Sequence, residues 1–239
     1  MTYPNDLALA AAPSWSLLGT EPLRALLEYA RMRRMDKAAL PRGDGHPVVI
    51  FPGLATDRRS MAPLKAFCEA LGYAAFDWGR GFNTGPEGDV DAWIDELAQH
   101  VQGLTAAHRQ RMSLIGWSLG GIYAREVAKR LRGRVRRVIT IGTPLSGTVE
   151  QTNLARVYRL LNGRTSALDE GLSARLRTPP DVPTTSIFSR TDGIVAWQAC
   201  IQDGDRQHTE NIEIEGSHVG MGWNPQVLSV IANRLRRSK

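Results

Sequence analysis

The chain of 239 residues is poor in cysteine and lacks any long hydrophobic run. Its two cysteines, Cys68 and Cys200, are too few for a disulfide framework, and both lie among apolar residues, so we expect buried thiols. No apolar stretch reaches the roughly 18 residues that a membrane-spanning helix needs. The apolar residues 7–12 follow an aspartate, with no lysine or arginine before them, which is atypical of a secretory signal. A cytoplasmic location is the resulting expectation.

The chain also has no large excess of charged residues of one sign. Lysine and arginine number 30 against 24 aspartates and glutamates, which gives a formal net charge of +6. Basic residues gather at 31–37, 130–137 and 234–239, near the ends of expected helices, where the helix dipole favours cations. This pattern favours a solvated surface, and we expect no nucleic-acid partner. Neither metal-ligand spacing nor a dinucleotide- or phosphate-binding loop is present, so we expect no metal and no cofactor.

What the chain does contain is a regular alternation of strand and helix patterns. Hydrophobic residues make up 42% and charged residues 23%, an ordinary globular composition. Short runs of the buried-strand type occur at residues 48–51, 73–76, 112–115, 135–141, 186–188 and 211–214. Helical periodicity separates most of them. The sequence therefore predicts a single α/β domain over residues 1–239, with a doubly wound, mostly parallel sheet and helices on both faces.

Two segments stand outside this alternation. Residues 1–45 are expected to form a helical extension, in which Thr20 caps a helix beginning at Glu21. The expected apolar face of that helix consists of Leu23, Leu26, Leu27 and Ala30. Residues 148–184 follow a strand ending in Gly-Thr-Pro, contain no strand pattern and are expected to form a helical cap. An ordinary packed helix and a lid are both open for this excursion.

The pattern with the clearest chemistry is Gly-x-Ser-x-Gly, formed by Gly116, Ser118 and Gly120. A buried strand leads into it and a helix follows, so Ser118 is expected on a sharp, strained turn with its hydroxyl above the sheet. Neighbouring backbone approaches such a turn closely, and glycines two before and two after leave room for it. Ser118 is therefore the candidate nucleophile, and an ordinary turn serine is the alternative.

From residue 48 to the C-terminus the chain resembles the α/β-hydrolases, nearest to their lipase and carboxylesterase branch. Phe-Pro-Gly-Leu at residues 51–54 is similar to the family's oxyanion loop, although Pro52 stands where many relatives have histidine. The segment at residues 141–147 resembles the Gly-Thr-Pro segment of lipases. The resemblance implies that the amides of Leu54 and Leu119 donate to an oxyanion.

The base of such a site must follow a late strand. Among the five histidines, His218 alone comes after a strand at its carboxyl end and before a helix. His208 is the rival, although it enters the last strand from the opposite end. The other three histidines precede the first sheet strand or belong to a helical region, and they are His46, His100 and His108.

The candidate acid is Asp192, at the carboxyl end of the strand over residues 186–188, where the resembling family keeps its acid. Gly193 is expected to let the chain turn away. Asp203 and Asp205 are nearer to the candidate histidine in sequence but lie in a polar loop, and Asp192 itself has an ordinary turn role as its alternative. The order serine, aspartate, histidine is that of the α/β-hydrolases.

Together these features predict a serine hydrolase that cleaves carboxylic esters as an esterase or lipase through an acyl-enzyme. Apolar residues around the expected site favour a small-molecule ester with an apolar acyl group. Acyl transfer, thioester or amide cleavage on the same residues, and a non-catalytic binding protein on the same fold, are the alternatives. A lipid–water interface stays open as a partner, and the sequence carries no signal for an oligomeric state.

Overall fold

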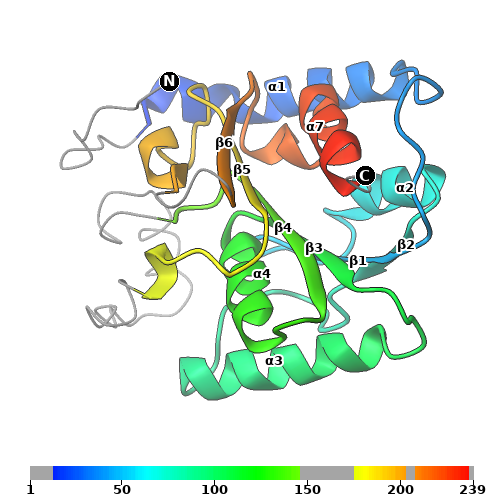
Figure 1. The fold of residues 1–239 in the computed structure, drawn as a ribbon. Helices are drawn as coiled ribbons and strands as arrows, with labels where there is room; N and C mark the ends of the chain where they lie inside the picture. Colours follow the sequence, from blue (N-terminus) through cyan, green and yellow to red (C-terminus); the bar gives the residue numbers. More distant parts are fainter. Residues whose placement is uncertain (1–12, 146–174, 203–207, 237–239) are drawn as a thin grey trace.

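The computed structural model describes residues 13–145, 175–202 and 208–236, which form six strands and the helices around them. All six strands are parallel and lie in the order β2-β1-β3-β4-β5-β6 (Figure 1). The strands are β1 (Pro47–Phe51), β2 (Ala74–Asp77), β3 (Met112–Trp117), β4 (Val135–Ile141), β5 (Thr184–Phe188) and β6 (Thr209–Glu213). This open sheet confirms the predicted doubly wound α/β fold.

Helices cover both faces of the sheet, as the sequence predicts. They are α1 (Trp15–Arg33), α2 (Ala62–Ala70), α3 (Val90–Leu104), α4 (Leu119–Arg130) and α7 (Pro225–Leu235), with short 3₁₀ helices η3 (Trp197–Cys200) and η4 (Val219–Gly222). Figure 1 shows α1, α2 and α7 on one side of the sheet and α3 and α4 on the other. Successive residues of a strand face opposite sides, so Ile50 packs with α2 and α7 while Val49 packs with α3 and α4. Both faces are therefore apolar at β1, which explains its uninterrupted hydrophobic run.

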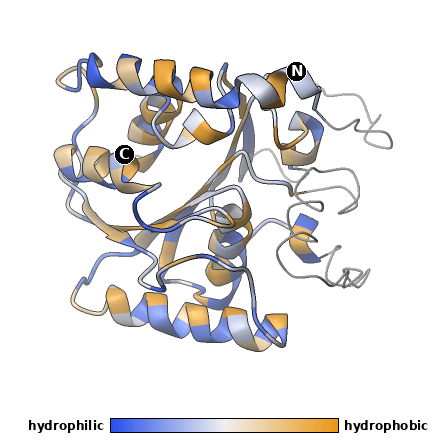
Figure 2. Cartoon of the chain, turned by 180° about the vertical axis from the view of Figure 1, so that it is seen from behind, coloured by the Kyte–Doolittle hydropathy of each residue, from blue (hydrophilic) through white to orange (hydrophobic). Residues whose placement is uncertain are grey.

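Two helix starts are capped by side chains that accept hydrogen bonds from the first turn. Helix α3 begins after Asp89, whose carboxylate accepts a hydrogen bond from the Ala92 N–H at 2.9 Å. Helix α7 begins after Asn224, whose side chain accepts one from the Gln226 N–H at 2.9 Å. Apolar and polar residues alternate along α3 in Figure 2, as expected of a helix with one buried face.

Helix α1 begins earlier than predicted. Its first residue is Trp15, and the side chain of Ser14 caps it by accepting from the Leu17 N–H. Thr20 lies inside the helix, where its hydroxyl donates to the carbonyl of Ser16 at 2.9 Å, so the predicted cap at Thr20 is wrong. A threonine hydroxyl can bond back to its own helix in this way, and the capping pattern alone does not exclude it.

The buried face of α1 is also the opposite of the predicted one. Leu23 is 60% exposed and Leu26 63%, and Leu27 and Ala30 are exposed as well. The residues that α1 buries are Glu21, Ala25, Glu28 and Met32. Two carboxylates on a buried face need hydrogen-bond donors, and the loops beneath α1 supply them.

The sheet also indicates where a ligand would bind. Its strand order reverses at β1, because β2 lies on one side of β1 and β3 begins the series on the other. In open α/β sheets, ligands bind beyond the carboxyl ends of the strands at such a switch point. Here those ends are Phe51 of β1 and Trp117 of β3, which lie within two of the motifs singled out in the sequence.

Several other expectations concern the rest of the chain. Both cysteines are free and buried as predicted, and burial raises the pKa of the Cys68 thiol to about 12, which makes it unreactive. None of the helices in the described ranges has the length and apolar character to cross a membrane. The cap expected over residues 148–184 falls mostly on residues 146–174, outside the described part.

Candidate active site

Ser118 lies on the bend between β3 and α4. Its backbone has φ 53° and ψ −125°, a conformation that a residue with a side chain rarely adopts and that costs on the order of 1–3 kcal/mol. The Ser118 N–H donates to the carbonyl of Ile141 at the end of β4, at 2.8 Å, which ties the bend to the neighbouring strand. The strained turn is where the Gly-x-Ser-x-Gly pattern predicts it.

The glycines on either side of Ser118 are required by close backbone contacts. A Cβ on Gly116 would meet the backbone of Gly120 and Gly121, and a Cβ on Gly120 would lie 2.6 Å from the carbonyl oxygen of Pro52. Backbone cannot withdraw from such contacts as a flexible side chain could. The two glycines therefore let β3 and α4 meet at Ser118, as the sequence indicates.

His218 and Asp192 form a buried pair beyond the ends of β6 and β5. The imidazole Nδ1 lies 2.6 Å from Oδ2 of Asp192, and both residues are 3% exposed. The other carboxylate oxygen, Oδ1, accepts the N–H groups of Ile194 at 2.8 Å and Val195 at 2.7 Å. Asp192 is thus fixed through one oxygen and directs the second at the histidine.

The histidine loop lies against the residues that surround Ser118. The indole N–H of Trp117 donates to the carbonyl of His218 at 3.1 Å, and the two rings lie 5.6 Å apart between centroids. A Cβ on Gly142, one residue after β4, would come within 3.0 Å of the imidazole Nδ1. The Ser118 N–H donates a hydrogen bond to Ile141, the last residue of β4. The structure therefore brings Ser118, His218 and Asp192 to the carboxyl edge of the sheet.

The surroundings of His218 favour its protonated form. Burial by itself would lower the pKa of His218, but the charge and hydrogen bond of Asp192 act in the opposite direction, and the charge of Glu21 adds to them. The net effect raises the pKa of His218 above its ordinary value of 6.5. An imidazole that gains a proton easily is suited to act as a general base.

The loop after β1 passes directly beside the serine. A Cβ on Gly53 would lie 3.3 Å from the Cβ of Ser118 and 3.1 Å from the Trp117 ring, so glycine allows this close approach. Within the described residues, the Leu54 N–H donates to no protein acceptor. Leu119 is the first residue of α4, and the first N–H groups of a helix have no partner inside it. Both amides are available to an anionic oxygen.

Asn83 was missed by the sequence analysis, although it fixes this loop. It is fully buried, and its Nδ2 donates to the carbonyls of Pro52 at 3.0 Å and Gly53 at 3.1 Å. Because C=O and N–H of one trans peptide point in opposite directions, holding the Gly53 carbonyl also fixes the direction of the Leu54 N–H. Asn83 belongs to no recognisable sequence motif, and only the tertiary structure brings it to the loop.

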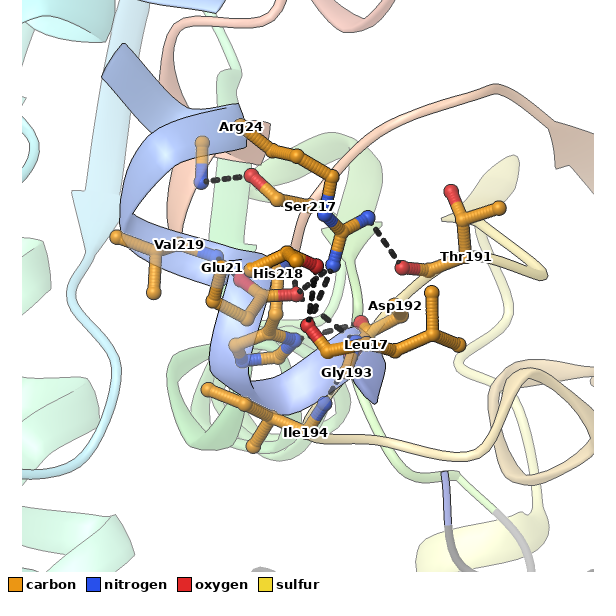
Figure 3. Close-up of polar contacts among 12 residues, drawn as sticks. Leu17, Glu21, Arg24, Thr191, Asp192, Gly193, Ile194, Ser217, His218 and Val219 are labelled. Carbon is orange, nitrogen blue, oxygen red and sulfur yellow. Dashed lines mark hydrogen bonds and ion pairs between the residues drawn. The ribbon is translucent and has the colours of Figure 1, made fainter. Parts of the chain in front are cut away.

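Glu21 and Glu28 of α1 were missed as well, and both lie over the same site (Figure 3 shows Glu21). Glu21 accepts the N–H groups of His218 at 3.0 Å and Gly193 at 2.8 Å, and Glu28 accepts that of Ser217 at 2.7 Å. Their seven-residue spacing places them on one helical face, and this was the available signal. The leucines on the opposite face were the stronger signal, and they predicted the wrong buried face.

Gly193 has a different function from the predicted one. Its φ is not in the left-handed region. A Cβ there would instead lie 2.7 Å from the carbonyl carbon and oxygen of Leu17, so glycine makes room for α1. The turn is made mainly by Asp192, whose carboxylate caps the two N–H groups that follow.

A second set of the same residue types occurs at the opposite edge of the sheet. His46 Nδ1 lies 2.5 Å from Asp44, and His46 Nε2 lies 2.8 Å from the hydroxyl of Ser113. His46 and Ser113 are both fully buried, which leaves a substrate no access. Arg136 also donates to Asp44 at 2.9 Å. These hydrogen bonds therefore hold neighbouring segments of the sheet together and do not form an accessible site.

The alternative candidates from the sequence lie elsewhere. The carbonyl of His208 accepts from the Thr184 N–H, which places His208 at the amino ends of β5 and β6, away from Ser118. Asp203 and Asp205 lie outside the described residues. In the described ranges no group of three or more histidine, cysteine, aspartate or glutamate residues could hold a metal ion.

Comparison with known proteins finds a curated relative and, among solved structures, proteins with a similar fold. A pimeloyl-[acyl-carrier protein] methyl ester esterase of Shewanella woodyi is 29% identical over 102 residues, which is 42% of this chain and 37% of that protein. Bacillus licheniformis lipase BlEst2 has a TM-score of 0.61 at 18% identity, covering 84% of this chain and 96% of that one. Aspergillus fumigatus lipase B has a TM-score of 0.63 at 20% identity, covering 87% and 57%.

The family comparison covers more of the sequence. The model of the alpha/beta hydrolase family matches residues 48–225, from the first strand through the histidine loop to the start of α7. This range includes the strained serine, the buried aspartate–histidine pair and the loop after β1. On this match and on the parallel sheet described above, the chain belongs to the alpha/beta hydrolase family.

Proposed function

We propose that the protein is a serine hydrolase that cleaves carboxylic esters, with Ser118 as nucleophile, His218 as general base and acid, and Asp192 as the residue that orients the histidine. The observation that carries this proposal is the buried Asp192–His218 pair, held at 2.6 Å, at the same edge of the sheet as a serine in a strained conformation. A pair of this kind is useful when a neighbouring hydroxyl must be activated.

The proposed reaction has two halves. His218 Nε2 takes the proton of the Ser118 hydroxyl as its oxygen bonds to the ester carbonyl carbon, and the same nitrogen then protonates the departing alcohol. In the second half His218 takes a proton from water, the water oxygen attacks the acyl-enzyme, and Ser118 recovers its proton. The amides of Leu54 and Leu119 receive the negative oxygen in both halves.

The substrate class follows from the family and its neighbours. The curated relative is an esterase and two similar folds are lipases, which supports ester hydrolysis on this fold. The side chains of Leu119, Leu145 and Val195 are buried near the site, which favours an apolar acyl group. Acyl transfer and thioester or amide cleavage need the same three residues and differ only in the acceptor or leaving group.

Covalent labelling tests the proposal directly. We expect a fluorophosphonate to modify Ser118 alone, as identified by mass spectrometry, and the labelled protein to lose hydrolysis of p-nitrophenyl esters. A panel of esters of increasing acyl length, with a thioester, an amide and alcohol acceptors beside it, separates the alternatives. Absence of labelling in folded protein would favour a non-catalytic binding protein.

The pH dependence follows from the sign of the histidine shift. The general base acts as neutral imidazole, and its surroundings raise the pKa of His218 above 6.5. We therefore expect kcat/KM for an ester to rise with pH through a midpoint above 6.5 and then level off. A histidine without these neighbours would place the midpoint between roughly 6 and 7. A midpoint well below 6.5 would contradict the assignment.

Substitution of Asn83 tests the loop that carries the Leu54 amide. Asn83→Asp places a carboxylate oxygen against the carbonyls of Pro52 and Gly53 in place of a donor, and we expect kcat to fall by about tenfold to a hundredfold with little change in KM. Tyr123→Phe is the control, because its hydroxyl donates to Oδ1 of Asn83, the other end of that side chain, at 3.2 Å. Equal kcat values for the aspartate variant and the wild type would show that Asn83 does not hold the loop.

A further inference from the structure

The carboxylate of Glu21 joins the two loops that carry Asp192 and His218. Its Oε1 accepts the N–H groups of Gly193 at 2.8 Å and His218 at 3.0 Å, and its Oε2 accepts that of Val219 at 2.9 Å (Figure 3). Glu21 is only 3% exposed. One side chain from α1 thus bonds directly to His218 and to the residue after Asp192.

Arg24, one turn later on α1, completes the contact on the other side of Asp192. Its Nη1 donates to the carbonyl of Thr191 at 2.6 Å, and its Nη2 donates to Glu21 at 2.8 Å. Asp192 is therefore held through both of its chain neighbours, Thr191 and Gly193. Charge-assisted hydrogen bonds of this kind are shorter and stronger than neutral ones. Here the charged partners, Glu21 and Arg24, both belong to α1.

Glycines in both loops show how closely α1 approaches. A Cβ on Gly193 would meet the backbone of Leu17 at 2.7 Å, and a Cβ on Gly220 would meet the carboxylate of Glu28. Glu28 itself accepts from the N–H and the hydroxyl of Ser217, the residue before His218. Desolvation raises the pKa of Glu28, and the hydrogen bonds of Ser217 oppose that effect.

We propose that Glu21, braced by Arg24, is a positioning residue for the reaction: it holds the aspartate loop and the histidine loop at the separation that Asp192 and His218 need. This proposal rests on the proposed function. Glu21 does not touch a reacting atom and acts through His218 and Asp192. Its negative charge also lies near the imidazolium that forms during the reaction, where it favours that form.

Three variants separate positioning, charge and simple stability. Glu21→Gln keeps the size but removes the charge, and it turns an amide donor towards at least one of the loop N–H groups. Glu21→Asp keeps the charge but is one methylene too short to reach all of them. Glu28→Gln is the matched control, a buried carboxylate on the same helix that bonds Ser217 and not His218. Thermal unfolding is measured for all three, together with kcat and KM against pH.

For Glu21→Gln we expect kcat to fall roughly tenfold with KM almost unchanged, and the acid limb of the pH profile to move to lower pH. This limb is the titration of His218, and the charges that act on it are Asp192 from the loop after β5 and Glu21 of α1, with which Arg24 pairs. For Glu21→Asp we expect a similar loss of kcat with the acid limb near that of the wild type. Glu28→Gln is expected to reduce thermal stability and to leave the acid limb in place.

Two results would overturn the proposal: an unchanged kcat in folded Glu21→Gln, or the same pH profile in Glu21→Gln and Glu28→Gln. If Glu21→Gln fails to fold, Glu21→Asp gives the decision, because positioning requires its kcat to fall. An NMR titration of the His218 imidazole, assigned with His218→Gln, needs no turnover. It tests the contact with Glu21 even if the wild type hydrolyses no ester, so failure of the proposed function is distinguishable from failure of this inference.

Discussion

Ser118→Ala is expected to reduce kcat for ester hydrolysis by at least about a thousandfold, because no other group can form the acyl-enzyme. The substitution removes only the hydroxyl oxygen, so KM for a p-nitrophenyl ester should change little. The backbone of Ser118 has a positive φ, which alanine must also adopt, so the strain is retained in the variant. The assay compares purified wild type and variant under saturating substrate.

Ser113→Ala is the matched control for this experiment. Ser113 bonds a histidine that is paired with an aspartate, just as the proposed nucleophile requires, but it is fully buried at the other edge of the sheet. We expect its loss to affect stability and to leave kcat near that of the wild type. Equal activity of Ser118→Ala and wild type, or a large loss in Ser113→Ala alone, would refute the assignment of Ser118.

Asp192→Asn is expected to lower kcat by about 10⁴-fold without unfolding the protein. The reason lies in the two carboxylate oxygens. Oδ1 accepts the N–H groups of Ile194 and Val195, so the amide oxygen of the variant must stay on that side. The NH₂ group then faces Nδ1 of His218 and forces that nitrogen to accept. The proton moves to Nε2, which can no longer take one from Ser118.

This prediction is checked by kinetics and by the state of the imidazole together. The variant should show the kcat loss across the whole pH range, and ¹⁵N NMR should find the proton on Nε2 of His218. Asp192→Ala is the comparison, since it also removes the acceptors of the two loop amides and should cost more thermal stability. A variant with nearly full activity would mean that Asp192 only forms the turn.

The sheet and the candidate site residues could be predicted because each has a local signal. Buried runs such as β1 and β3 identify central strands, and Ser118 is marked by the glycines that its sharp turn requires. Asp192 and His218 were identified from their places at strand ends. The structure now puts them 2.6 Å apart, while their catalytic roles stay predictions for the experiments above.

The supporting residues could not be predicted because their partners are distant in sequence. Asn83 bonds carbonyls 30 and 31 residues away, and Glu21 bonds amides more than 170 residues away. On α1 the usual rule that leucines face the core gave the wrong side. Here the free backbone N–H groups of two loops decided which face was buried, since unpaired buried donors cost more than exposed leucines.

Helix α1 ends at Arg33, whereas the stretch recognisable as an alpha/beta hydrolase starts only at residue 48. The part of the chain that matches the family therefore does not include the helix that supports the Asp192 and His218 loops. A protein trimmed to the recognisable stretch would keep the sheet, the serine, the aspartate and the histidine, but the amides of Gly193, Ser217, His218 and Val219 would lose their anionic acceptors. Shortening the chain by homology alone would therefore remove the helix that holds the loops of Asp192 and His218.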